Sequence, residues 1–89
     1  MIVVDEPRWP RHERVWCHLA SDTSFDELHA FARAVGIPER GFDGDHYDLP
    51  EDRRDDAIAA GAVPVTSREL VAMLHKAGLR RRRPRSAKT

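Results

Sequence analysis

Histidine and aspartate occur close together in the chain, and this pairing suits either metal binding or proton transfer near neutral pH. His46 and Asp48 stand two residues apart in the segment His46–Leu49. Residues two apart in a β-strand point to the same face, so this ring and this carboxylate would lie side by side. His18 lies in a second strand-like segment, residues 15–20. We predict His18, His46 and Asp48 as the catalytic residues.

Three more residues are candidates for the same site. Asp5 follows an N-terminal apolar run, and Asp22 follows the segment that contains His18. His29 lies at the edge of the apolar face of a predicted helix, from which its ring could reach the sheet. The donors suggest a divalent ion, Zn²⁺, Mn²⁺ or Fe²⁺, with these candidate ligands: His18, His29, His46, Asp48, Asp5 and Asp22. Each also has a structural interpretation, as a turn residue, a helix cap or a hydrogen-bonded histidine.

These residues lie on a predicted alternation of strands and helices. Strands are predicted at Ile2–Val4, Val15–Ala20, His46–Leu49 and Val63–Val65. Helices are predicted at Phe25–Val35, at Glu51–Ala60 and after Thr66, where Leu70 and Leu74 belong to an apolar stripe. The order β-β-α-β-α-β-α indicates the α/β class, with a small mixed sheet of three to four short strands and three helices.

Capping signals bound the helices. Ser24 and Glu27 have the spacing of a capping box, in which each side chain binds a free backbone N–H group. Gly36 supplies the left-handed residue that commonly ends a helix. Thr66 and Glu69 repeat the capping-box spacing before the last helix.

Polar residues follow several predicted strands, which suggests a binding site at one edge of the sheet. Ligands of open α/β sheets bind outside the carboxyl ends of the strands. If the strands are parallel, five side chains would gather at that edge: Asp5, His18, Asp22, Asp48 and Ser67. Two helix N-termini would face the same edge and offer backbone N–H groups to a phosphate.

The length of 89 residues allows one small α/β domain, which we place at residues 1–79. The chain carries 15 Lys and Arg against 15 Asp and Glu, but the only charged residues within Arg80–Thr89 are basic. Residues 80–89 are therefore predicted to form a basic disordered tail on an acidic body. Through Arg80–Lys88 this tail could contact nucleic acid.

The remaining features concern location and the reactive or aromatic side chains. Cys17 is the single cysteine, so an internal disulfide is excluded and a buried structural thiol is favoured over a nucleophile.

The sequence shows neither a signal-peptide pattern nor an apolar run long enough to cross a membrane, so we expect a cytoplasmic protein without a membrane partner. Trp9 and Trp16 are expected in the core or in a lid rather than stacked on a base.

Five short motifs follow one another along the chain: V-D-x-x-R-W-P at 4–10, W-C-H-L-x-S-D at 16–22, E-L-H-A-F-A at 27–32, H-Y-D at 46–48 and A-A-G-A-V-P-V at 59–65. Together they resemble a bacterial and phage family catalogued as domain of unknown function 4031, over about residues 1–79. The resemblance implies a small stand-alone cytoplasmic domain and brings no activity with it. The family pattern includes Asp5, His18, Asp22, His29, His46 and Asp48, which implies a shared site.

Two functions from different classes fit these observations. The first is a hydrolase-like protein that binds a divalent metal or a phosphate through the His/Asp cluster and acts on a nucleotide or another small phosphate-bearing molecule. A homodimer could then complete a pocket that so short a chain has little room to form. The alternative is a non-enzymatic module that contacts a protein or nucleic acid, with the arginine-rich tail assisting.

Overall fold

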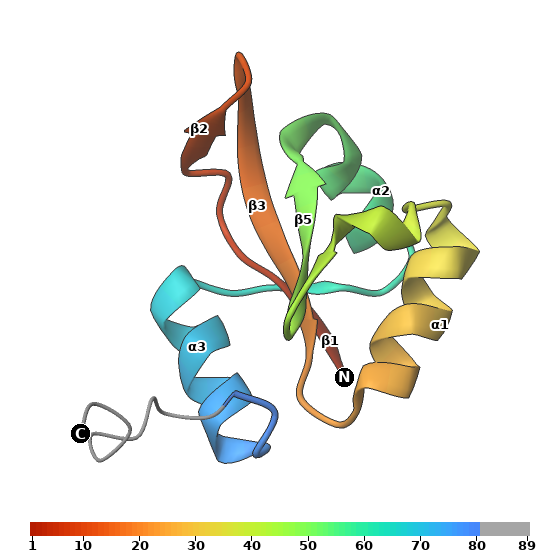
Figure 1. The fold of residues 1–89 in the computed structure, drawn as a ribbon, viewed down its shortest axis with the longest axis vertical. Coiled ribbons are helices and arrows are strands. Elements are labelled where there is room, and N and C mark those ends of the chain that lie inside the picture. The colour runs from red at the N-terminus through yellow and green to blue at the C-terminus, as the bar shows by residue number, and fades with distance from the viewer. Residues whose placement is uncertain (81–89) are drawn as a thin grey trace, which may run out of the picture.

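A computed structural model describes residues 1–80, which fold into one mixed six-stranded sheet with three α-helices (Figure 1). The strands are β1 (Ile2–Val4), β2 (Trp9–Arg11), β3 (Arg14–Ser21), β4 (Phe42–Asp43), β5 (His46–Pro50) and β6 (Val63–Pro64). The helices are α1 (Phe25–Val35), α2 (Arg54–Ala59) and α3 (Ser67–Lys76), with 3₁₀ turns η1 (Glu39–Gly41) and η2 (Glu51–Arg53). The predicted α/β class is confirmed, with more strands than the three to four expected. The tail prediction for residues 81–89 lies outside the described residues.

The direction of β3 makes the sheet mixed. The strand order is β4-β5-β3-β1-β6, and β2 pairs with the first part of β3. β3 is antiparallel to both β1 and β5, whereas β1 and β6 are parallel. We expected parallel strands whose carboxyl ends lie together at one end of the sheet. This expectation is not met, because the carboxyl end of β3 lies at the opposite end of the sheet from those of β1 and β5.

Alternation along the strands divides the sheet into two faces. The closed face carries the buried side chains Ile2, Val4, Cys17, Leu19, Tyr47 and Leu49, and it packs against α1 and α2. The open face carries Val3, Asp5, Trp16, His18, Ala20, His46 and Asp48. On this face α3 covers one end only, where Leu70 and Leu74 pack. Figure 1 shows α1 and α2 on one side of the strands and α3 on the other.

A hairpin that the sequence did not indicate extends the open face. β2 pairs with β3 across a two-residue turn, His12 and Glu13, whose φ angles are 53° and 61°. Positive φ at both central residues matches the twist of a two-residue hairpin turn. β2 gave no strand signal because it is short and contains Pro10, which a strand tolerates at an edge. The hairpin places Trp9 beside the ring of His18.

The second helix is shorter than the predicted Glu51–Ala60. Pro50 ends β5, where it pairs with Trp16, and the chain passes through η2 before α2 begins at Arg54. The fixed φ of proline suits the end of a strand as well as the start of a helix, so its position was ambiguous.

The capping predictions hold in part. The Thr66–Glu69 capping box is complete. At α1 only half of the box forms: Ser24 accepts from the Glu27 backbone, while the Glu27 side chain accepts from Ser21 instead. Gly36 ends α1 with a φ of 83°, as predicted.

Candidate functional site

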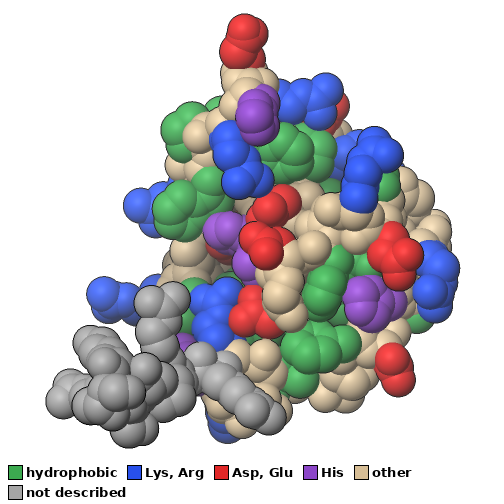
Figure 2. All heavy atoms as spheres, in the orientation of Figure 1, with side chains coloured by type: hydrophobic (Ala, Val, Ile, Leu, Met, Phe, Trp, Pro, Cys, Tyr) green, Lys and Arg blue, Asp and Glu red, His purple; other side chains and the backbone are tan. Residues whose placement is uncertain are grey.

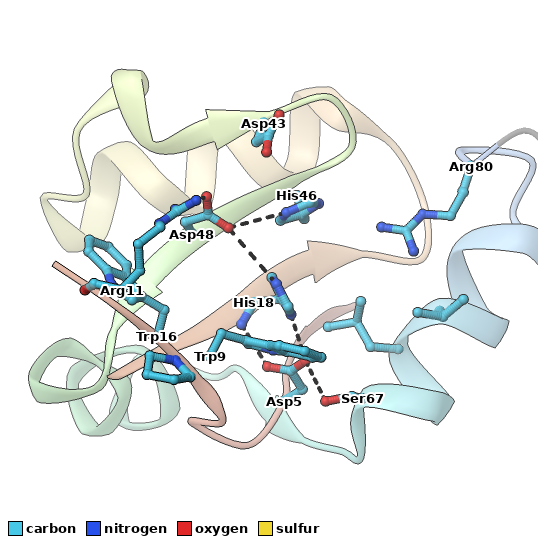
Figure 3. Close-up of a pocket in the computed structure, with 13 residues that line it drawn as sticks. Asp5, Trp9, Arg11, Trp16, His18, Asp43, His46, Asp48, Ser67 and Arg80 are labelled. Atoms are coloured by element: carbon cyan, nitrogen blue, oxygen red, sulfur yellow. Dashed lines mark hydrogen bonds and ion pairs between the residues drawn. The ribbon is translucent and has the colours of Figure 1, made fainter. Parts of the chain in front are cut away.

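His18, His46 and Asp48 meet on the open face, as Figure 3 shows. His18 lies directly opposite Asp48 in the pairing of β3 with β5, and His46 precedes Asp48 by two residues on the same face. One donor atom from each of the three side chains lies within 4.8 Å of the others. Their predicted proximity is confirmed, while their catalytic roles stay a prediction.

One oxygen of Asp48 faces a nitrogen of each histidine ring. Its Oδ1 lies 3.2 Å from Nε2 of His46 and 3.9 Å from Nε2 of His18. Two ligand atoms bound to one tetrahedral zinc ion at the usual bond lengths lie about 3.3 Å apart. The three donors therefore stand close to the spacing at which they could share one ion.

Asp5 orients the ring of His18. Its Oδ1 accepts the backbone N–H of His18 at 2.6 Å, and its Oδ2 lies 2.8 Å from His18 Nδ1 and accepts the Ser67 hydroxyl at 2.9 Å. Burial alone would raise the pKa of Asp5, but the hydrogen bonds from His18 and Ser67 outweigh it, so this pKa lies below its usual range. Because an ionised carboxylate only accepts, Nδ1 of His18 donates to Asp5, and Nε2 is the ring nitrogen that faces Asp48.

Asp45 does the same for His46. Its Oδ1 lies 2.7 Å from Nδ1 of His46, and Arg80 donates to both of its oxygens, at 2.6 and 3.0 Å. Partial burial raises the pKa of Asp45, while Arg80 and His46 lower it by more, so the group stays ionised at neutral pH. Nε2 of His46 is consequently the nitrogen that faces Asp48.

A cleft of about 550 Å³ opens over this cluster. Trp9 and Trp16 line one side, and Arg11 and Arg80 bring positive charge to the wall. Arg11 donates to Oδ2 of Asp48 at 3.2 Å, which leaves Oδ1 to the histidines. Figure 2 shows histidine side chains recessed between acidic and basic ones on this face. The volume is in the range of small-ligand sites.

Two predicted ligands lie elsewhere. His29 is on the closed-face side, where its Nδ1 lies 2.6 Å from the Tyr47 hydroxyl and its ring packs on Phe42. Asp22 lies at the start of β1, where its carboxylate accepts from the Met1 amino group. Sequence spacing did not separate these residues from the cluster, because face and strand direction depend on distant partners.

The sequence prediction did not assign four of the residues found here to the His/Asp site: Asp45, Arg80, Trp9 and Arg11. Asp45 stands next to His46, and this adjacency was the one local signal available. The other three reach the cleft through the β2–β3 hairpin or from beyond α3. Arg80, assigned to the tail from the sequence, pairs with Asp45. Trp9 is 46 % exposed, so it lines the cleft rather than the core.

Cys17 is excluded from the cleft by the alternation of β3. Its side chain is buried on the closed face and donates to the Leu49 carbonyl at 3.4 Å. Burial and the nearby Asp5 charge raise its pKa to about 12. The predicted burial of this thiol is confirmed, and it has no access to a ligand in the cleft.

The family model described as Protein of unknown function (DUF4031) matches residues 2–77. The chain belongs to this family. The matched segment of this DUF4031 protein includes the cluster of His18, His46 and Asp48 together with Asp5 and Asp45, and it stops before Arg80. No curated protein and no solved structure matches the chain. Within residues 1–80, none of the helices has the length and apolar character that crossing a membrane requires.

Proposed function

We propose that this protein binds one divalent metal ion through Nε2 of His18, Nε2 of His46 and the carboxylate of Asp48, and that it hydrolyses a phosphate-bearing substrate in the cleft above them. Two imidazoles and one carboxylate form a donor set used by catalytic zinc sites and by non-haem iron sites. Three protein ligands leave coordination positions for water and substrate.

The arrangement of the two rings carries this proposal. Each ring is held at Nδ1 by a carboxylate, Asp5 for His18 and Asp45 for His46. Each ring then directs Nε2 toward the same oxygen of Asp48. Metal-binding histidines usually donate their second N–H to a carboxylate or carbonyl in this way, which fixes the tautomer and the ring orientation. Two such carboxylate–histidine pairs therefore face the same atom, Oδ1 of Asp48.

The charge around the cluster favours a cation. Asp5, Asp45 and Asp48 surround the two imidazoles, and the lowered pKa values of the first two keep them ionised. Arg80 neutralises the charge of Asp45, and Arg11 contacts only Oδ2 of Asp48. A divalent ion would supply a positive charge beside Oδ1 of Asp48, the oxygen that faces the two histidines.

The expected reaction is hydrolysis of a phosphate ester. A bound divalent ion would polarise a phosphoryl oxygen and lower the pKa of a water molecule. The water oxygen bonds to phosphorus, the ester P–O bond breaks, and the proton lost by the water ends on the departing alcohol oxygen. Arg11 and Arg80 line the cleft, where their positive charges would attract the negatively charged phosphate.

Metal titration of the full chain tests this proposal. After removal of metals with EDTA, calorimetry with Zn²⁺, Mn²⁺ or Fe²⁺ should detect one ion per chain, and Asp48→Asn should weaken binding by at least about 100-fold. Asp52→Asn, an exposed aspartate of η2, is the matched control and should bind like the wild type. The loaded protein should release nitrophenolate from bis(4-nitrophenyl) phosphate. Absence of a stoichiometric ion, or equal affinities for the two variants, would overturn the proposal.

A further inference from the structure

A second hollow lies beside the cleft and differs from it in charge. It measures about 490 Å³ and shares Arg11, Trp16 and Asp48 with the cleft, so the two lie side by side. Its charged lining residues are four arginines against two aspartates: Arg11, Arg14, Arg40, Arg53, Asp48 and Asp52. We call this hollow the arginine groove. The cleft suits a cation, whereas the arginine groove suits an anion.

The arginines reach the groove from four separate elements. Arg11 comes from β2, Arg14 from β3, Arg40 from η1 and Arg53 from η2. Arg14 and Arg40 are exposed, and neither forms an ion pair within residues 1–80. The guanidinium groups of Arg14 and Arg40 are thus available to an external anion.

Arg53 is held in place rather than free. Its Nη2 donates to the Val35 carbonyl at 2.7 Å, and its Nε donates to Asp56 at 3.2 Å. These bonds fix the guanidinium between the end of α1 and Asp56 of α2, near the buried Ile37 that also lines the groove. A fixed arginine loses little conformational entropy when it binds an anion.

Two tryptophans line the cleft, and one of them, Trp16, also lines the arginine groove. Trp9 and Trp16 lie opposite each other on β2 and β3. Trp9 is 46 % exposed, and its ring centroid is 5.3 Å from that of His18. Trp16 lies under the guanidinium of Arg11, at 5.8 Å from its ring centroid. Aromatic rings beside basic side chains are the common means of binding unpaired bases.

We propose that the substrate is single-stranded nucleic acid, with the phosphodiester to be cleaved over His18, His46 and Asp48 and the neighbouring phosphates along the arginine groove. This inference rests on the proposed hydrolase and names its substrate class. A single phosphate would use only the cleft, whereas a strand also uses the groove and the tryptophans. Water adds to phosphorus, one sugar–phosphate P–O bond breaks, and the departing sugar oxygen takes the proton.

The first measurement separates strand binding from metal chemistry. Fluorescein-labelled oligothymidine DNA and oligouridine RNA of about 12 nucleotides are titrated with the full chain in EDTA, and anisotropy is read at several salt concentrations. We expect the Arg14→Ala/Arg40→Ala double variant to bind about tenfold more weakly, with a salt slope smaller by about 1.4. The matched control, Arg68→Ala/Lys76→Ala, removes the same charge from exposed positions on α3 and should bind like the wild type. All variants share residues 81–89, so any contribution of that segment cancels.

A second pair of variants tests stacking. Trp9→Ala should weaken binding about tenfold, and Trp9→Phe should restore most of it, because a smaller aromatic ring still stacks. Failure of both oligonucleotides to bind, equal loss in the α3 control, or equal affinity for a duplex of the same length would overturn the inference. The metal titration of Asp48→Asn does not depend on these anisotropy measurements. A wrong substrate class would show only in the oligonucleotide titrations, whereas a wrong metal site would show in the calorimetry.

Discussion

The two faces of β5 carry histidine contacts of opposite kinds. On the closed face, Nδ1 of His29 meets the hydroxyl of Tyr47, and the ring packs against Phe42. On the open face, Nδ1 of His18 and Nδ1 of His46 meet carboxylates, and Nε2 of each faces a third carboxylate beside a cleft. A histidine in this fold is thus a candidate ligand when an acid holds one nitrogen and the other nitrogen faces an open, acidic surface.

The largest expected effect lies on the closed face and concerns stability. Leu28→Ala should lower the free energy of unfolding by about 2–5 kcal/mol, because this side chain of α1 is fully buried in the core against the sheet. Leu74→Ala should cost a similar amount where α3 covers the open face. His12→Ala, at an exposed hairpin turn, should change little. Urea denaturation measures all three, and equal midpoints for Leu28→Ala and His12→Ala would show that the faces are misassigned.

Exchange of single histidines tests the contrast between the faces directly. His46→Ala should weaken metal binding by at least about 100-fold, because it removes a ligand. His29→Ala should leave the metal affinity within about twofold of the wild type, because its ring lies on the other side of the sheet. Calorimetric titration of both variants decides the matter. The reverse ranking would place the site on the closed face.

The carboxylates behind the histidines should have a smaller effect than the ligands. Asp45→Asn and Asp5→Asn each weaken the hold on one ring, and such changes cost about 10–100-fold in metal affinity. Asp22→Asn serves as the comparison, since Asp22 lies near the start of β1 and Asp5 directly follows its end. We expect its affinity to match that of the wild type, and a loss there as large as that of Asp45→Asn would contradict the arrangement.

The smallest effect concerns the thiol on the closed face of β3. The pKa of Cys17 is raised from 9.0 to about 12 by burial, so the folded state keeps the protonated form. Its contribution to stability is present below about pH 9 and is lost as the pH rises toward about 12. Between about pH 8 and pH 10 the wild type should lose about 1.4 kcal/mol more than Cys17→Ala. Parallel pH profiles of unfolding for the two proteins would contradict the burial of this thiol.

The sequence was sufficient for features that depend on a few neighbouring residues. The alternation Trp16–His18 against Cys17–Leu19, the shared face of His46 and Asp48, and the bounds of α1 all follow from local periodicity and capping. The strand count was underestimated because β2 and β4 are short and have no apolar pattern. Their pairing comes from neighbouring hairpin strands and not from propensity.

Only the tertiary structure decided which acids and histidines meet. The antiparallel register sets His18 opposite Asp48. The direction of β3 also places Asp22 beside the start of β1, at the other end of that strand from Asp5. Arg80 reaches Asp45 across 35 positions of the chain, and Ser67 reaches Asp5 across 62. Strand direction and helix packing are set by burial summed over the whole core, so contacts at such separations leave no local pattern for a single sequence to reveal.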